Sequence, residues 1–463
     1  MYSELINSII HNKSLRFIDA ETKTESGVQE IFIDHEIIAG GKRSLAFLYI
    51  DNSLNSVRVL LSFLRSEHVV ALLSPRLNPV FKNNLEALYS PVLIYDFTRE
   101  SIPGYSFQTV ADGISLFTGI TGRDYPIHDS LKVLLSTSGT TGSPKFVKLS
   151  ENNLLSNAVS ILDYLPVNHT HNTPLNLPVY YSYGLSVLTT NAIRGGRIIC
   201  TNKDVLNKEF WTDFNNYQYS SIAGVPYVYE VLHRIGFTKK SYPSIRYMTQ
   251  AGGKLNNELV KVFGNYAKEN NIRFYVMYGQ TEATARMSYL DPAYLDSKIG
   301  SIGKPILNGK FYIDEHSGEL CYTGPNVFGG YANEIPDLQF FEMNDELKTG
   351  DIASVDSDGF YYITGRSKRF VKIAGSRINL DEVESMLRNK FEGIALYCTG
   401  LNDKFILVVT MDMNFDLNLA IDFISEELAL HRTFVKTRHM EQIPLTENGK
   451  VNYNLIRSQY EAG

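Results

Sequence analysis

A loop rich in glycine and hydroxyl groups occupies residues 134–150, where the sequence reads LLSTSGTTGSPKFVKLS. Gly139 and Gly142 permit backbone conformations in which several N–H groups converge on an anion. The loop is not a Walker A motif, because Pro144 and Phe146 stand where that motif has glycine and a hydroxyl residue. Residue types alone therefore leave two interpretations open, a phosphate-binding loop or an ordinary turn rich in serine and glycine.

The segments beside this loop predict a hairpin rather than the start of a helix. Residues 131–135 form a strand-like apolar run before the loop, and residues 146–150 form a second one after it. Ser150 then has a side chain suited to a helix N-cap. Apolar residues follow at helical spacing on one predicted face. They are Leu154, Leu155, Ala158, Val159 and Leu162.

Strand-like and helix-like segments alternate from residue 44 onward. Strand patterns cover residues 44–50, 69–75 and 91–97, and helical patterns cover 55–67 and 78–90. Strand–helix–strand units of this length predict a parallel sheet covered by helices. Further strand patterns occur at 195–200, 220–225, 245–253 and 273–279. We therefore expect an α/β fold.

The C-terminal third follows a different pattern. From Gly318 the strands are short and punctuated by glycine and aspartate, with Asp358 and Gly359 at a predicted hairpin turn. This pattern is typical of an antiparallel sheet or a small barrel. After Arg366, strands and helices cover about 95 residues, a normal size for a small α+β domain. We expect a large domain at 1–366, with parallel-sheet α/β subdomains and a small antiparallel β-barrel, and a small mobile α+β domain at 367–463.

Composition excludes several classes of protein. The chain has 463 residues, 44% of them apolar and 20% charged, which predicts a globular protein of two or three domains. The formal net charge is −6, and no long Lys/Arg block occurs, so we expect no nucleic-acid partner. No apolar run of 18 residues predicts a membrane span. Three widely spaced cysteines, Cys200, Cys321 and Cys398, predict buried free thiols and a cytoplasmic location.

Six further segments extend the pattern of the glycine-rich loop. They are LPVYYSYGLSV at 177–187, MTQAGGKL at 248–255, MYGQTEA at 277–283, GELCYTGPNVFGGYAN at 318–333, LKTGDIASVDSDGFYYITGRSKRFVKIAGSRI at 347–378 and PLTENGKV at 444–451. Together with TSGTTGSPK at 137–145, these segments resemble, in order and over nearly the whole chain, the adenylate-forming superfamily of acyl-CoA synthetases, adenylation domains and luciferases. The resemblance implies that ATP and Mg²⁺ activate a carboxylic acid as an acyl-adenylate, with release of pyrophosphate, before the acyl group moves to a thiol.

The resemblance also implies roles for single residues at the ATP site. It places Tyr278 against adenine, Thr281 on the α-phosphate and Glu282 on Mg²⁺, for which a carboxylate is a suitable ligand. Asp351 is expected to accept both ribose hydroxyls, and Arg366 to contact the nucleotide nearby. The other implied nucleotide-binding residues are Thr137, Ser138, Gly139, Thr140, Thr141, Gly142, Lys145, Gly252, Gly279 and Lys368.

The two half-reactions are expected to use different faces of the small domain. The resemblance implies that Lys450 bridges the carboxylate and the α-phosphate while the adenylate forms. It places the hinge of the subsequent rotation at Lys368, and the passage for a pantetheine arm beside Gly375. The implied catalytic residues are Lys450, Glu282, Thr281 and Thr137.

Residues from two of these segments are expected to form the acid pocket. The resemblance implies that it is lined by Tyr180, Tyr183, Gly184, Ala251 and Gly252. The aromatic segment carries no acidic residue that could pair with a substrate ammonium group, so we expect a small carboxylic acid rather than an amino acid. CoA, the phosphopantetheine of a carrier protein acting in trans, and an amine all stay open as acceptors. An amino-acid-activating enzyme and a non-catalytic nucleotide-binding scaffold are the alternative functions.

Two residues depart from the pattern of the superfamily. Phe146 stands where glycine is usual, and Glu151 stands where histidine is common. Neither change removes a group that is expected to react.

Overall fold

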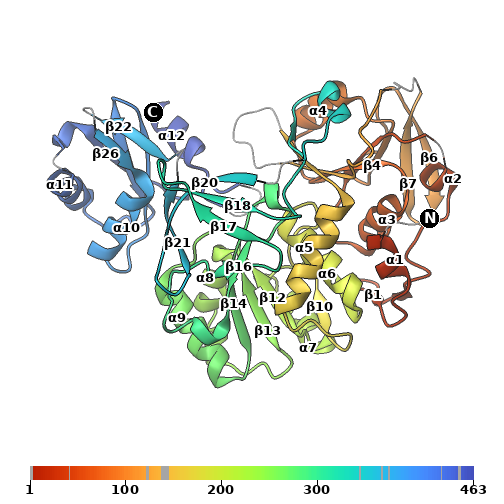
Figure 1. The fold of residues 1–463 in the computed structure, drawn as a ribbon, viewed down its shortest axis with the longest axis horizontal. Helices are drawn as coiled ribbons and strands as arrows, with labels where there is room; N and C mark the ends of the chain where they lie inside the picture. The colour runs from red at the N-terminus through yellow and green to blue at the C-terminus, as the bar shows by residue number, and fades with distance from the viewer. Residues whose placement is uncertain are drawn as a thin grey trace. The chain divides into compact units, whose positions relative to one another are not determined.

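The computed structural model describes residues 4–40, 42–120, 125–136, 145–343, 346–366, 369–373, 376–428, 430–446 and 450–462. The chain divides into two compact units, and its path is drawn in Figure 1. Unit 1 comprises Met1–Lys310 and Thr323–Leu347, and unit 2 comprises Phe311–Tyr322 and Lys348–Gly463. A domain boundary at residue 366 stays a prediction.

The largest sheet of unit 1 contains the strands on both sides of the glycine-rich loop. Its order is β19-β9-β8-β4-β3-β5-β7-β6. The four central strands pair in parallel, and antiparallel strands complete both edges. The strands are β3 (Leu45–Tyr49), β4 (Val69–Leu73), β5 (Leu93–Asp96), β6 (Tyr105–Ala111), β7 (Ile114–Gly119), β8 (Val133–Ser136), β9 (Phe146–Leu149) and β19 (Tyr331–Ala332). Helices α3 (Leu54–Arg65) and α4 (Pro79–Tyr89) connect β3, β4 and β5 as the alternating pattern predicts.

The predicted hairpin and N-cap are confirmed, but the predicted face of the next helix is partly wrong. β8 pairs antiparallel with β9, and the Ser150 side chain accepts a hydrogen bond from the Asn153 amide at 3.1 Å. Val159 in α5 (Glu151–Tyr164) is 44% exposed, whereas Asn157 is buried. The buried face includes this asparagine because its amide finds a backbone partner in a distant segment, the carbonyl of Arg286.

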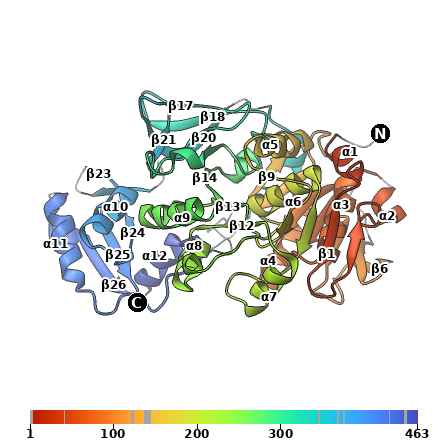
Figure 2. The same ribbon diagram turned by 90° about the horizontal axis from the view of Figure 1, so that it is seen from below.

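A five-stranded sheet of unit 1 places several predicted site residues at the carboxyl ends of its parallel strands. Its order is β12-β13-β14-β15-β16, with the first three strands parallel. The strands are β12 (Ser221–Gly224), β13 (Tyr247–Gln250), β14 (Arg273–Tyr278), β15 (Ser288–Leu290) and β16 (Lys304–Pro305). Helices α8 (Pro226–Arg234) and α9 (Asn257–Glu269) pack beside the parallel strands (Figure 2). Ligand sites in parallel sheets form at the carboxyl ends of the strands, where Ala251 and Gly279 lie.

The third sheet of unit 1 has the order β10-β11-β1-β2. Its strands are β1 (Arg16–Asp19), β2 (Glu25–Gly27), β10 (Asn172–Pro174) and β11 (Arg197–Cys200). The remaining helices of this unit are α1 (Glu4–Ile10), α2 (Glu36–Ala39), α6 (Ser182–Arg194), α7 (Lys208–Tyr217) and the 3₁₀ turns η1 (Phe237–Lys239), η2 (Thr281–Ala283), η3 (Pro292–Tyr294) and η4 (Ile335–Gln339). Helices α5 and α6 run side by side (Figure 1), and α1 contacts both.

Unit 2 combines a four-stranded sheet with a smaller α+β part. The sheet has the order β17-β18-β20-β21, and Gly359 in the turn before β21 has a φ of 79°, as expected for the predicted hairpin. The strands are β17 (Lys310–Ile313), β18 (Glu319–Thr323), β20 (Glu346–Val355), β21 (Tyr361–Arg366), β22 (Phe370–Ile373), β23 (Ser376–Asn379), β24 (Leu396–Leu401), β25 (Phe405–Thr410) and β26 (Val435–His439). The helices are α10 (Leu380–Lys390), α11 (Leu417–Glu427), α12 (Tyr453–Glu461) and the 3₁₀ turn η5 (Arg432–Phe434).

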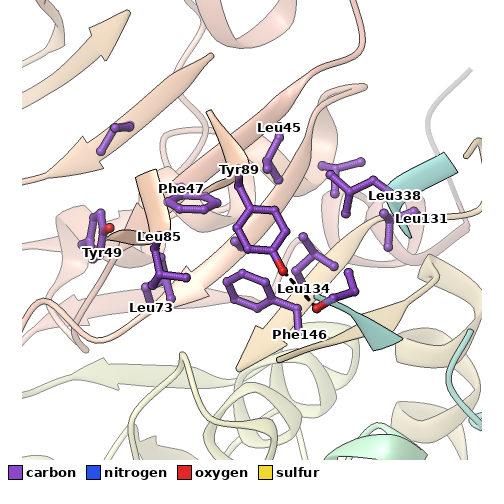
Figure 3. Packing of buried hydrophobic residues seen from close by; sticks show 14 of the residues in the cluster. Leu45, Phe47, Tyr49, Leu73, Leu85, Tyr89, Leu131, Leu134, Phe146 and Leu338 are labelled. Atoms are coloured by element: carbon purple, nitrogen blue, oxygen red, sulfur yellow. Dashed lines mark hydrogen bonds between the residues drawn. The ribbon is translucent and has the colours of Figure 1, made fainter. Parts of the chain in front are cut away.

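Phe146, one of the two departures from the superfamily pattern, has a packing role. Its side chain is fully buried, with the ring centroid 5.1 Å from that of Tyr89 and 6.2 Å from that of Phe47. Figure 3 shows the three rings close together; Phe47 and Phe146 belong to strands of the eight-stranded sheet and Tyr89 to the end of α4. The Tyr89 hydroxyl donates to the carbonyl of Ala332 at 3.0 Å. The phenylalanine therefore anchors the first residue of β9, and with it one end of the glycine-rich loop, to the core.

Within the part of the chain that the structure describes, no helix combines the length and apolar character needed to cross a membrane. The three cysteines are buried and free, as predicted.

Candidate active site

The backbone after β14 makes a close approach that only glycine permits. A Cβ atom on Gly279 would lie 2.0 Å from the carbonyl oxygen of Ala285, far inside contact distance. Ala285 itself has a φ of 126°, a conformation that side-chain-bearing residues rarely adopt and that stores strain. The turn η2 lies between these two residues. The segment that carries Thr281 and Glu282 is thus held in one defined shape.

The buried Asn326, from a distant segment, stabilises the backbone of residues 283–286 by hydrogen bonds. Asn326 donates from Nδ2 to the carbonyls of Ala283 at 2.7 Å and Arg286 at 2.8 Å. Its own carbonyl accepts a hydrogen bond from the Thr284 hydroxyl at 2.7 Å. These bonds satisfy backbone groups that no regular element pairs, so the local strain is compensated by buried hydrogen bonds.

Glu282 is held by the hydroxyl of a tyrosine whose ring also contacts a lysine. The Tyr331 hydroxyl donates to Oε1 of Glu282 at 2.9 Å. The ammonium nitrogen of Lys145 lies 3.1 Å from the centroid of the Tyr331 ring, in a cation–π contact. Burial, followed by the Glu282 charge, raises the pKa of Tyr331, so its hydroxyl keeps its proton and donates. Two predicted site residues therefore meet through a tyrosine from β19.

The predicted α-phosphate residue lies beside the start of α6. The hydroxyls of Thr281 and Ser182 are 3.4 Å apart. Ser182 is the first residue of α6, whose N-terminal amides carry partial positive charge. A Cβ atom on Gly184 would lie 2.1 Å from the Pro178 carbonyl oxygen, so this turn of helix packs closely on the preceding chain. Hydroxyl donors and a helix start are thus placed next to the Glu282 segment.

Aromatic side chains surround the predicted acid pocket. Gly252 has a φ of 85°, and a Cβ atom there would lie 3.2 Å from the Tyr181 hydroxyl. Tyr183 is buried and donates to Oγ1 of Thr249 at 2.7 Å. Burial raises the pKa of Tyr183 to about 12. Tyr183 therefore contributes its ring, while its hydroxyl is used within the protein. Tyr180, Gly184 and Ala251 lie in the same segments, partly or fully buried.

Unit 2 brings the predicted ribose residues together. Asp351 and Arg366 are direct partners across β20 and β21, and Nε of Arg366 lies 3.1 Å from Oδ1 of Asp351. The aspartate side chain is 8% exposed and that of the arginine 57%. The amide of Asp351 donates to the Thr349 hydroxyl at 3.1 Å. The carboxylate is therefore fixed on a hairpin, with the arginine reaching toward solvent.

Lys450 also lies on a hairpin of unit 2. Its amide donates to the Thr446 hydroxyl at 3.2 Å, and its carbonyl accepts from the Thr446 amide at 2.6 Å. Leu445 and Val451 form an antiparallel bridge just beyond, and α12 begins two residues later. The predicted catalytic lysine is thus bonded to Thr446 and precedes a helix.

Several predicted residues lie outside the described part of the chain. They are Thr137, Ser138, Gly139, Thr140, Thr141, Gly142, Lys368 and Gly375. Sequence patterns missed Tyr331 and Asn326, which bond to the Glu282 segment, and Arg286, which lies four residues after Glu282. The first two lie in the motif at 318–333, so membership of that motif is the sequence signal that could have identified them.

Comparison with known proteins gives a consistent result. The family model described as "AMP-binding enzyme" matches residues 46–332. A 2-succinylbenzoate–CoA ligase of Bacillus cereus (strain ATCC 10987 / NRS 248) is 27% identical over 383 residues, which cover 79% of this chain and 77% of the relative. The resemblance to adenylate-forming enzymes that the motifs indicate is thereby confirmed.

Solved structures share the fold over the whole chain. The O-succinylbenzoate coenzyme A synthetase of Bacillus subtilis in complex with AMP has a TM-score of 0.77 at 20% identity, covering 99% of this chain and 98% of that one. The same enzyme in complex with ATP and a magnesium ion has a TM-score of 0.75 at 20% identity, covering 98% and 99%. The predicted α/β fold class is confirmed by these likenesses.

Proposed function

We propose that this chain, which belongs to the AMP-binding enzyme family and is an AMP-forming acid–thiol ligase, joins a small aromatic carboxylic acid to CoA through an acyl-adenylate. In the first step a carboxylate oxygen attacks the α-phosphorus of ATP, and the bond to the bridging oxygen breaks to release pyrophosphate. In the second step the thiol sulfur attacks the acyl carbon, loses its proton and displaces AMP. The observation that carries this proposal is the clustering of Thr281, Glu282, Ser182 and Lys145 around one strained turn of unit 1.

The described residues supply the electrostatic part of the first step. Attack of an anion on a triphosphate builds up negative charge, so the site needs positive groups and dipoles that are already oriented. The Thr281 and Ser182 hydroxyls and the start of α6 are such donors. Lys145 adds a charge beside the Tyr331 ring. Lys450, from unit 2, is proposed to neutralise the crowded carboxylate and α-phosphate.

The Glu282 carboxylate fits the need for a divalent cation. Mg²⁺ usually binds one or two carboxylates together with phosphate oxygens and water, and when bound it neutralises phosphate charge and orients the leaving group. The Tyr331 hydroxyl occupies Oε1 of Glu282. This bond orients the carboxylate and leaves its other lone pairs for a cation.

The acid and the acceptor are inferred from the pocket and from the relatives. The Tyr181 hydroxyl lies close to Gly252, and the Tyr183 hydroxyl donates to Thr249. Two aromatic side chains thus stand at the predicted pocket segments, which suits an aromatic acid, and the segment 177–187 has no acidic residue to pair with an amine. The matched relative is named as a ligase of 2-succinylbenzoate and CoA. We therefore take CoA as the acceptor in preference to a carrier protein, and 2-succinylbenzoate as the first acid to test. The three free, buried cysteines support the expected reducing cytoplasm.

Acid-dependent exchange of labelled pyrophosphate into ATP tests the first step. The panel should hold 2-succinylbenzoate, other small aromatic acids, medium-chain fatty acids and amino acids. We expect exchange with an aromatic acid, and AMP and a CoA thioester when CoA is added. Exchange driven by amino acids alone would contradict the proposal. Exchange without formation of a CoA thioester would support adenylation but contradict the proposal that CoA is the acceptor.

A further inference from the structure

Arg286 is an arginine enclosed in the interior of unit 1. It is 2% exposed and lies four residues after Glu282. Its carbonyl accepts hydrogen bonds from Nδ2 of Asn157 at 3.0 Å and from Nδ2 of Asn326 at 2.8 Å. Its backbone carbonyl is therefore held by two side chains from distant parts of the sequence.

Aromatic groups surround this guanidinium. Its carbon Cζ lies 4.9 Å from the centroid of the Tyr183 ring. The Tyr164 hydroxyl, which donates to Sδ of Met277 at 3.2 Å, is a hydrogen-bonding neighbour of the guanidinium. Burial raises the pKa of Tyr164, as it does for Tyr183, so both phenols stay neutral. Neither ring can balance the arginine charge.

No carboxylate in the described ranges balances it either. Among the described residues no ion pair involves Arg286, and its Nε has no hydrogen-bond partner. Two other arginines, whose side chains are 15% (Arg369) and 21% (Arg43) exposed, have different partners. Arg369, within unit 2, pairs with Asp381 at 2.8 Å and Glu384 at 2.9 Å, and Arg43 donates to several backbone carbonyls. A buried charge that lacks a counterion is costly, so Arg286 has capacity for an anion that the protein does not supply.

We propose that Arg286 is a specificity-determining residue of the acid pocket, and that it binds a second anionic group on the acid, remote from the carboxylate that is activated. The proposal rests on the function proposed above. The Tyr183 ring, which belongs to the predicted pocket, lies under the guanidinium. A guanidinium presents paired N–H donors that match a carboxylate, and apolar walls strengthen this attraction. The substrate class is thus an aromatic dicarboxylate rather than a neutral-tailed acid.

Matched acids test the proposal in the full-length protein. 2-Succinylbenzoate carries two carboxylates; 4-oxo-4-phenylbutanoate lacks the ring carboxylate, and 2-butanoylbenzoate lacks the chain carboxylate. Pyrophosphate exchange should give the wild type a kcat/KM at least about 10-fold higher for the diacid than for either monoacid. Arg286→Met should lower the diacid value roughly 100-fold, as expected for loss of one partner of a buried charge pair, and change the better monoacid less than about 3-fold. For Arg286→Lys, which keeps the charge but loses the paired donors, we expect a kcat/KM for the diacid between those of the wild type and of Arg286→Met.

Arg43→Met is the control, since it removes another guanidinium of unit 1, on a side chain that is 21% exposed and contacts none of the proposed site residues. It should lower the melting temperature without changing the ratio of diacid to monoacid activity. Equal losses for diacid and monoacid in both Arg286 variants would overturn the proposal and assign the arginine a structural role. A wild type that activates only acids with neutral tails would also overturn it, while leaving adenylation intact. A wild type that activates no acid would instead contradict the proposed function.

Discussion

The turn around Glu282 in unit 1 and the Asp351 hairpin in unit 2 hold their polar groups in different ways. In unit 1, Glu282 bonds to Tyr331 from another strand, and the adjoining backbone is strained and tied by buried asparagine. In unit 2, Asp351 bonds to Arg366, its partner across one hairpin, and the arginine is largely exposed. The first arrangement requires many tertiary contacts, and the second needs only one hairpin. Substitutions in unit 1 should therefore change stability and chemistry together, whereas those in unit 2 should change chemistry alone.

The largest expected effect concerns Lys450 in unit 2. Lys450→Ala should slow pyrophosphate exchange about 10²–10³-fold, or about 3–4 kcal/mol, because one preorganised charge is lost where carboxylate and phosphate meet. Thioester formation from chemically prepared acyl-adenylate should stay near the wild-type rate. If both rates fall together while the melting temperature is unchanged, the expectation that the two half-reactions use different conformations of the small domain is wrong.

Glu282→Gln is the corresponding change in unit 1. It keeps the shape of the side chain but removes the charge expected to bind Mg²⁺, so exchange should fall roughly 100-fold at limiting Mg²⁺. Tyr331→Phe removes only the hydrogen bond that orients Glu282, and about a 10-fold loss is expected. Titration of the exchange rate with Mg²⁺ measures both. An unchanged dependence of the exchange rate on Mg²⁺ in Glu282→Gln would contradict the proposal that Glu282 binds Mg²⁺.

Asp351→Asn tests the second half of the comparison. One of two carboxylate acceptors for the ribose becomes a donor, so the KM for ATP should rise about 10-fold. The partly exposed pair with Arg366 contributes less than about 1 kcal/mol, so the melting temperature should hardly move. Initial-rate kinetics and thermal denaturation give the two values. A large loss of stability would show that the hairpin depends on this pair, and would contradict the expectation that substitutions in this hairpin change chemistry alone.

The smallest expected effect is on Tyr183 in unit 1. Tyr183→Phe removes the hydrogen bond to Thr249 and should lower the free energy of unfolding by about 1 kcal/mol, with the Arg286 contact to the ring retained. Because burial raises the folded-state pKa from 10.0 to about 12, the folded state holds its proton longer than the unfolded state. The stabilisation is therefore complete below pH 10 and is lost as the pH rises toward 12. Denaturant titrations of both proteins between pH 8 and 12 should converge; parallel curves would contradict the assigned shift.

Local patterns predicted the regular elements well. The strands β3, β4 and β5 and the helices between them were readable because their buried faces follow the periodicity of each element. The N-cap at Ser150 was also readable, since capping depends on residues only three positions apart. The exposed Val159 shows where this reasoning failed. Burial of Asn157 instead depends on the Arg286 carbonyl, 129 positions away.

The sequence by itself indicated the family and the alternation of strands and helices between residues 44 and 97, and it proposed Thr281, Glu282, Asp351 and Lys450 as site residues. It could do so because motif spacing and periodicity are properties of neighbouring residues. Tertiary structure alone decided that Tyr331 orients Glu282 and that Gly279 and Ala285 meet. It also decided that Arg286 is enclosed with no ion pair to any residue that the structure describes. Each of these depends on which distant segments the packed sheets and helices bring within a few ångströms, and that information is distributed over the whole chain.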